Sequence, residues 1–232
     1  MPMPDVQDNP VLRGELDEIR ALFLQMAVRA EGMVHQAFRA TLSSDPHRAR
    51  AVLDADRALD AMEVTIDARG VRTLGRHHPT GAALRFVTVV LKMVTDLERI
   101  GDLAVNIAER ALEIGLQPGL GPPAELGAMA DHVFVMLRDV TDAFVRVDSG
   151  VLSRLLPVEA ELDALHASAF RTLQARMVDH PDQVARALAW ASVGRHLERI
   201  GDHVINLARL VVLQVEGRDV RHLIGGGDGP AS

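Results

Sequence analysis

Two short acidic segments with the same sequence lie far apart in this chain of 232 residues. Leu97–Asp102 reads LERIGD and Leu197–Asp202 repeats these letters, and an asparagine follows each, at Asn106 and Asn206. Residues four apart in an α-helix lie on one face, so each segment places its glutamate beside its aspartate. The two pairs are Glu98 with Asp102 and Glu198 with Asp202. Adjacent carboxylates of this kind can bind a hard cation or be neutralised by an arginine.

A second row of acidic residues precedes each segment. Asp56, Asp60 and Glu63 follow helical spacing in the first half, and the matching row in the second half has His166 where Glu63 would predict an acid. If each pair of helices folds back at its His-Pro turn, the carboxylates of the two rows come to the same level. The expected level pairs are Asp60 with Glu98, Asp56 with Asp102, Asp163 with Glu198, and Glu159 with Asp202.

Eight carboxylates are therefore the candidate metal ligands: Asp56, Asp60, Glu98, Asp102, Glu159, Asp163, Glu198 and Asp202. Neighbouring like charges on a helix repel by a few tenths of a kcal/mol per pair, so something must offset them. The chain has no cysteine, and an oxygen-rich site without thiolates suits Mg²⁺, Ca²⁺, Mn²⁺ or iron, with zinc also compatible. Pairing with Arg99 or Arg199, or raised carboxylate pKa values, would offset the repulsion without a metal.

The elements that must position these residues are helices. Apolar residues recur with a period of about 3.6, and proline or glycine interrupts them. The pattern predicts helices over 10–42, 46–75, 80–115, 123–148, 151–179 and 181–216. Because the motifs repeat, the expected fold is all-α, with two tandem antiparallel three-helix bundles over 10–116 and 123–217. Residues 218–232 are rich in glycine and are expected to form a flexible tail.

Composition agrees with this fold and excludes several functions. Only 3% of residues are aromatic and 48% are hydrophobic, a balance that favours helices in a globular protein. The formal charge of −7 argues against general nucleic-acid binding, which needs a basic face. Neither a signal-peptide pattern nor an apolar stretch of about 20 residues is evident, so we expect a cytoplasmic protein.

The repeated LERIGD segments, each followed by an asparagine, resemble the signature of the PhoU family of phosphate-uptake regulators. The resemblance runs from about Val11 to Glu216. It implies two three-helix bundles whose acidic motifs bind metal clusters, mostly iron or zinc, at the eight carboxylates named above. It also implies a repressor of the phosphate-starvation response that contacts the Pst phosphate transporter and its sensor histidine kinase. Membrane association would then be peripheral, through these partners. The resemblance also suggests that the protein forms a homodimer.

Three positions depart from the family pattern. The family usually has asparagine where Asp60 stands, which adds charge to the first site. His196 replaces the aspartate found at the matching Asp96, and His166 replaces an acid in the second site. The two sites are therefore expected to differ in affinity or in metal. Asp96 and His196 point away from the acidic rows and are expected to be surface residues.

Two other functions compete with the regulator. Di-iron enzymes also place carboxylates in a helical bundle, but they need Glu-x-x-His, and Gly101 and Gly201 occupy the histidine positions. A helical interaction module that binds no metal would keep the regulatory role and lose the sites. A second apolar line on the third helix, formed by Ile100, Leu103 and Ile107, predicts a contact with another helix or with a dimer partner.

Overall fold

The computed structural model describes residues 9–116, 119 and 121–218, and every long element in this part of the chain is a helix. The helices are α1 (Pro10–Ser43), α2 (Pro46–His77), α3 (Gly81–Gly115), α4 (Ala124–Arg146), α5 (Val151–Asp179) and α6 (Val184–Glu216). The all-α prediction is confirmed. The predicted tail, 218–232, lies outside the described residues except for Arg218.

Most helix ends fall within two residues of their predicted positions because capping residues fix them. Asp45 accepts hydrogen bonds from the backbone N–H groups of His47 and Arg48 and so begins α2. Its neighbour Ser44 ends α1 in the left-handed conformation, with φ of 49°. The sixth helix is the exception. Pro181–Gln183 forms a 3-10 turn and α6 begins at Val184, three residues later than predicted.

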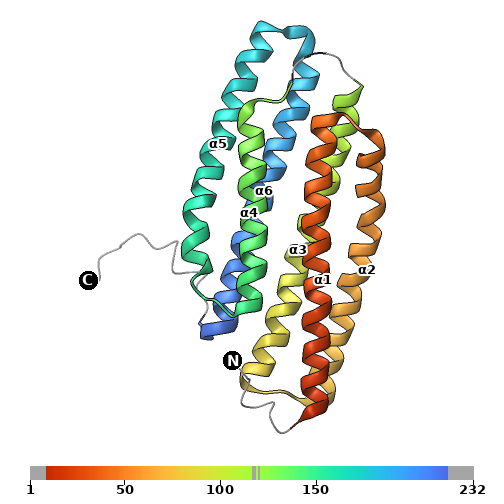
Figure 1. Cartoon of the computed structure of the whole chain (residues 1–232), viewed down its shortest axis with the longest axis vertical. Coiled ribbons are helices and arrows are strands. Elements are labelled where there is room, and N and C mark those ends of the chain that lie inside the picture. Colours follow the sequence, from red (N-terminus) through yellow and green to blue (C-terminus); the bar gives the residue numbers. More distant parts are fainter. Residues whose placement is uncertain (1–8, 117–118, 120, 219–232) are drawn as a thin grey trace, which may run out of the picture.

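The helices form two bundles that lie side by side, α1–α3 and α4–α6 (Figure 1). Helices α3 and α6 pack against each other at the centre, so both have neighbours on more than one side. This contact explains the second apolar line of α3. Ile100 and Ile107 are completely buried and Leu103 is 4% exposed, so the line packs within this chain.

Glycine allows close packing at the same point of each bundle. A Cβ atom on Gly101 would lie 2.2 Å from Cδ2 of Leu59, and Met33 is the next neighbour. A Cβ atom on Gly201 would lie 2.4 Å from Cδ2 of Leu162, and Met136 follows. The two cores therefore use equivalent residues. The interval in sequence from Met33 on α1 to Met136 on α4 is the same as that from Leu59 on α2 to Leu162 on α5.

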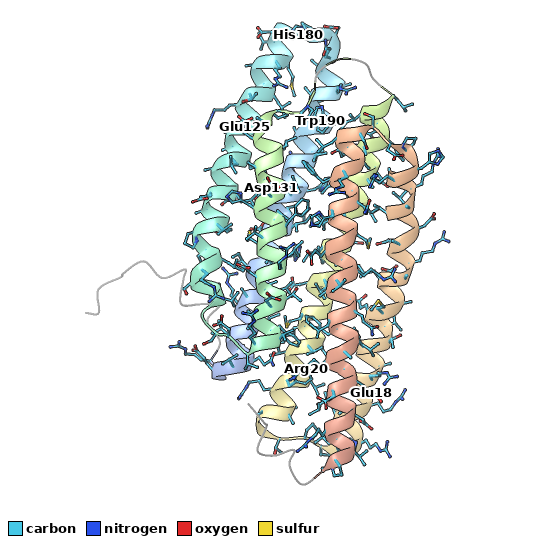
Figure 2. The ribbon with its side chains drawn as sticks, viewed as in Figure 1. Glu18, Arg20, Glu125, Asp131, His180 and Trp190 are labelled. Atoms are coloured by element: carbon cyan, nitrogen blue, oxygen red, sulfur yellow. The ribbon has the colours of Figure 1, made fainter. Side chains whose placement is uncertain are left out.

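Aromatic side chains are scarce, yet several of them lie between the two bundles. The rings of Phe23 on α1 and Phe144 on α4 are 4.4 Å apart, and Phe86 on α3 lies 6.3 Å from Phe144. Arg20, which Figure 2 labels on α1, places its guanidinium carbon 5.2 Å from the centre of the Phe86 ring. These contacts add aromatic packing to an interface between otherwise aliphatic cores.

Each bundle also supplies an arginine to the end of the other bundle's third helix. Arg85 Nε on α3 donates to the carbonyl of Gln214 at 3.0 Å, and Arg186 Nη1 on α6 donates to the carbonyl of Ile114 at 2.9 Å. Neither α3 nor α6 has a basic residue of its own in its last turn. A cation at a helix C-terminus is stabilising, so each bundle caps the other.

Among the described residues, no helix is both long and apolar enough to cross a membrane.

Candidate metal-binding site

The structure brings the first set of predicted ligands together between α2 and α3. Asp56 lies close enough to Asp60 and Asp102 for their charges to interact, and burial together with these charges raises the pKa of Asp56. Burial likewise raises the pKa of Glu98, and the charges of Asp102, Glu63 and Asp60 raise it further. The expected meeting of the two acidic rows is therefore confirmed in this half.

An arginine partly neutralises this first cluster. Arg99 Nη1 lies 3.0 Å from Asp102 Oδ2, and Arg99 Nε lies 3.4 Å from Glu98 Oε2. The arginine is more than half exposed, so each ion pair contributes less than about 1 kcal/mol. Asp56 receives no such help, because its buried Oδ1 has no hydrogen-bond partner among the described residues. A buried carboxylate oxygen without a donor favours either protonation or a cation beside it.

The second set forms an equivalent cluster between α5 and α6. Burial raises the pKa values of Glu159, Glu198 and Asp202, and neighbouring acids raise them further. Asp163 is one of those neighbours in all three cases. The level pairs predicted for this half therefore also come together.

The second cluster is neutralised differently. Arg199 makes no ion pair within 4 Å with any described residue, and its charge acts on Glu198 and Asp202 from farther away. His166 on α5 lies near Glu198, and its charge opposes the rise in the pKa of that carboxyl group. Asn206 accepts a hydrogen bond from Arg209 Nη1 at 3.0 Å, so its amide oxygen already has a donor.

These clusters are not closed coordination sites. In the part of the chain that the structure describes, no group of three or more acidic or histidine side chains is arranged to hold one metal ion. The residues nevertheless fit the chemistry of a cation, because their donors are carboxylate oxygens and no described residue donates a hydrogen bond to Asp56 Oδ1. Assignment of the eight carboxylates as ligands stays a prediction.

The expectation that Asp96 and His196 are surface residues is wrong. His203 Nδ1 on α6 donates to Asp96 Oδ1 on α3 at 2.8 Å, and these side chains are 21% and 18% exposed. His196 is half-buried, and burial, followed by the charge of Arg110, lowers its pKa to about 4. The sequence contained a signal for this interface, because Asp96 lies on the same helical line as Ile100, Leu103 and Ile107.

Comparison with known proteins agrees with this architecture. The PhoU domain model matches the chain twice, over residues 23–111 and 126–211. The chain is 36% identical to the phosphate-specific transport system accessory protein PhoU homolog of Pseudomonas putida, over 90% of this chain and 82% of that protein. It is 33% identical to the PhoU protein of Escherichia coli K12, over 92% of this chain and 88% of that protein. The chain belongs to the PhoU family.

Solved structures show the same fold. The crystal structure of PhoU from Pseudomonas aeruginosa superposes with a TM-score of 0.84 at 33% identity, covering 89% of this chain and 99% of that one. The phosphate transport system regulatory protein PhoU from Streptococcus pneumoniae gives a TM-score of 0.82 at 24% identity. The latter likeness concerns the fold alone.

Proposed function

We propose that this protein regulates phosphate transport and represses the phosphate-starvation response when phosphate is plentiful. The observation that supports this proposal is the match to PhoU relatives along nearly the whole chain, since these relatives are named as accessory proteins of the phosphate-specific transport system. The regulator would act in the cytoplasm by contact with the Pst phosphate transporter and its sensor histidine kinase.

The proposed role is regulation and not catalysis. A di-iron enzyme would need a histidine three residues after Glu98 or Glu198. Those positions hold Gly101 and Gly201, where even a Cβ atom would lie 2.2 Å or 2.4 Å from a leucine side chain. A histidine could not occupy either position without displacing the core, which supports a non-catalytic function.

The acidic clusters are proposed as cation sites of this regulator. Asp56, Asp60, Glu98 and Asp102 would hold metal in the first bundle, and Glu159, Asp163, Glu198 and Asp202 would hold it in the second. Iron or zinc is the proposed metal, with manganese, magnesium or calcium compatible with the oxygen donors. A bound cation would neutralise the carboxylates. The residues of the chain would orient it and leave the outer side open to solvent.

A regulator without metal is the second candidate, and Arg99 is the observation that favours it. The guanidinium of Arg99 already contacts Glu98 and Asp102, so a cation would compete with it in the first bundle. In that case the acidic clusters would be a solvated surface for contact with partner proteins.

Deletion of the gene tests the regulatory role. In medium rich in phosphate, we expect a phosphate-starvation reporter to be switched on and phosphate uptake to change, with both restored by the wild-type gene. If reporter output and uptake stay unchanged, this protein does not regulate the phosphate response.

Elemental analysis tests the metal separately. Purified wild-type protein should retain iron or zinc, and the variant Glu98→Ala, Asp102→Ala, Glu198→Ala, Asp202→Ala should lose it. Absence of metal from both proteins after soaking with iron, manganese or zinc would leave the metal-free regulator as the function.

A further inference from the structure

An open groove runs between α1 and α2 on the first bundle. It contains two adjoining hollows of about 560 and 510 Å³ that meet at Arg29. Apolar residues line much of it, among them Leu24, Val28, Met62 and Val52. Val28 is 64% exposed, so this groove presents apolar surface to solvent.

Arg29 is the charged group at the middle of the groove. It is exposed, and among the described residues it makes no ion pair within 4 Å. The other arginine of the groove, Arg48, is already held by Asp45 and by Gln36. The groove therefore combines an apolar lining with one cation that lacks a carboxylate.

In the second bundle, the residue that corresponds to Arg29 is paired with a carboxylate. Met33 and Leu59 of the first bundle correspond to Met136 and Leu162 of the second. The same interval in sequence makes His132 the counterpart of Arg29, and Glu161 the counterpart of Ala58. His132 Nε2 donates to Glu161 Oε2 at 3.0 Å across α4 and α5. The second bundle thus supplies its own carboxylate to the side chain at this position, whereas Ala58 in the first bundle cannot.

The neighbours of Arg29 on α1 also differ in polarity or size from their counterparts on α4. The counterpart of exposed Val28 is Asp131, which Figure 2 labels on α4. The counterpart of Gly32, which lines the groove, is Val135. The first bundle is therefore apolar and open where the second bundle is charged or filled.

We propose that this groove binds an amphipathic helix of a partner protein, and that a carboxylate on the apolar face of this helix pairs with Arg29. The proposal deepens the proposed function, because it assigns a surface for contact with a regulated protein that is separate from the acidic clusters. Leu24 and Gln36 mark its extent on α1, which corresponds to about 18 Å and seats about three turns of helix. A helix of this kind binds through apolar residues at i, i+3 or i+4, and i+7.

Photo-cross-linking in living cells tests the proposal with the full chain. Benzoylphenylalanine replaces Val28 in the groove or, as a matched control, Val71 of α2, which is 63% exposed and outside the groove lining. The cross-linked peptides are then sequenced by mass spectrometry. The Val28 probe should capture a helical segment with an apolar stripe and an acidic residue within it, and the Val71 probe should not.

Charge exchange identifies the role of Arg29. Arg29→Glu should lower the cross-linking yield at least about tenfold, because it sets two carboxylates against each other. Changing the captured acidic residue to lysine should restore the yield. Arg50→Glu, which makes the same change of net charge on an exposed residue of α2, should leave it unchanged, and all variants should keep the melting temperature of the wild-type protein.

Several outcomes would overturn the proposal. These are equal capture from Val28 and Val71, a captured segment without the apolar stripe and acid, equal losses with Arg29→Glu and Arg50→Glu, or capture of a peptide from a second copy of this chain. The test is independent of the gene deletion. If the reporter does not respond to deletion while charge exchange succeeds, the phosphate role fails and the groove stands.

Discussion

The two bundles of this protein have nearly the same core but treat their surface charges differently. In both, a glycine of the third helix contacts a leucine of the second, and a methionine of the first lies next to it. In both, burial and neighbouring acids raise the pKa values of carboxyl groups. Among the described residues, however, an arginine directly contacts the LERIGD carboxylates of the first bundle and not those of the second.

Identical motifs do not give identical sites in this protein. Arg99 and Arg199 occupy the same position of the repeat, yet only Arg99 forms ion pairs within the described part of the chain. Near Glu198 the second bundle has His166, where the first has Glu63. Burial of the acids follows from the shared fold, whereas neutralisation depends on individual neighbours.

Substitution of the two glycines tests whether the cores are equivalent. Gly101→Leu and Gly201→Leu should each lower the free energy of unfolding by about 3 kcal/mol, because the new side chain overpacks the contact with Leu59 or Leu162. Chemical denaturation measures both values, and Gly14→Leu is the control because no described residue lies within 4 Å of its Cβ position. Losses that differ by more than about 1 kcal/mol would show that the two cores are not equivalent.

The sequence was sufficient to predict the helices and their pairing. Apolar periodicity located the six long helices of the described residues, and the Asp45 cap marked the beginning of α2. Pairing the acidic residues that lie at the same distance from the His-Pro turn predicted that Asp56 lies near Asp102. This worked because two antiparallel helices joined by a short turn have little freedom in register. The start of α6 was missed because proline permits both an α-helix and a 3-10 turn at its first position.

Contacts between the bundles could not be predicted in the same way. Asp96 and His203 belong to different halves of the chain, and nothing local indicates that they meet. The ion pairs of Arg99 depend on rotamers of long, exposed side chains, which helical spacing alone does not determine. The apolar line through Leu103 indicated a packed face, but it did not indicate which helix would cover it.

His196 on α6, whose pKa responds to Arg110 on α3, should make the stability of the protein depend on pH. Its pKa is about 4 in the folded protein, against an ordinary value of 6.5 for a solvated histidine, so the unfolded chain binds a proton that the folded chain does not. Stability should therefore fall as the pH drops from about 6.5 to 4. A fully buried group with this pKa would account for about 3 kcal/mol, and partial exposure of the imidazole reduces this to about 1 kcal/mol.

The variant His196→Leu should lose this part of the pH dependence. It should also keep its stability at pH 7, because the buried Nδ1 of His196 has no hydrogen-bond partner to lose in the part of the chain that the structure describes. Urea denaturation between pH 4 and pH 7 measures the difference from wild type, with exposed His47→Leu as the control. A difference that does not vary with pH would show that His196 titrates normally.

Arg99 and Arg199 should also differ slightly in their contributions to stability. Arg99→Ala should lower the free energy of unfolding by about 0.5 kcal/mol at pH 7, as for other exposed ion pairs, and Arg199→Ala should lower it less because its nearest carboxylates lie beyond 4 Å. Since Arg99 opposes the rise in the pKa of Glu98, the loss should shrink near pH 4, where Glu98 is protonated because its pKa lies above the ordinary 4.5, and in 1 M salt. Denaturation of both variants under these conditions measures the contrast. Equal losses at pH 7 would mean that long-range charge, and not the ion pairs of Arg99, neutralises the acidic clusters, and that the two bundles are electrostatically alike.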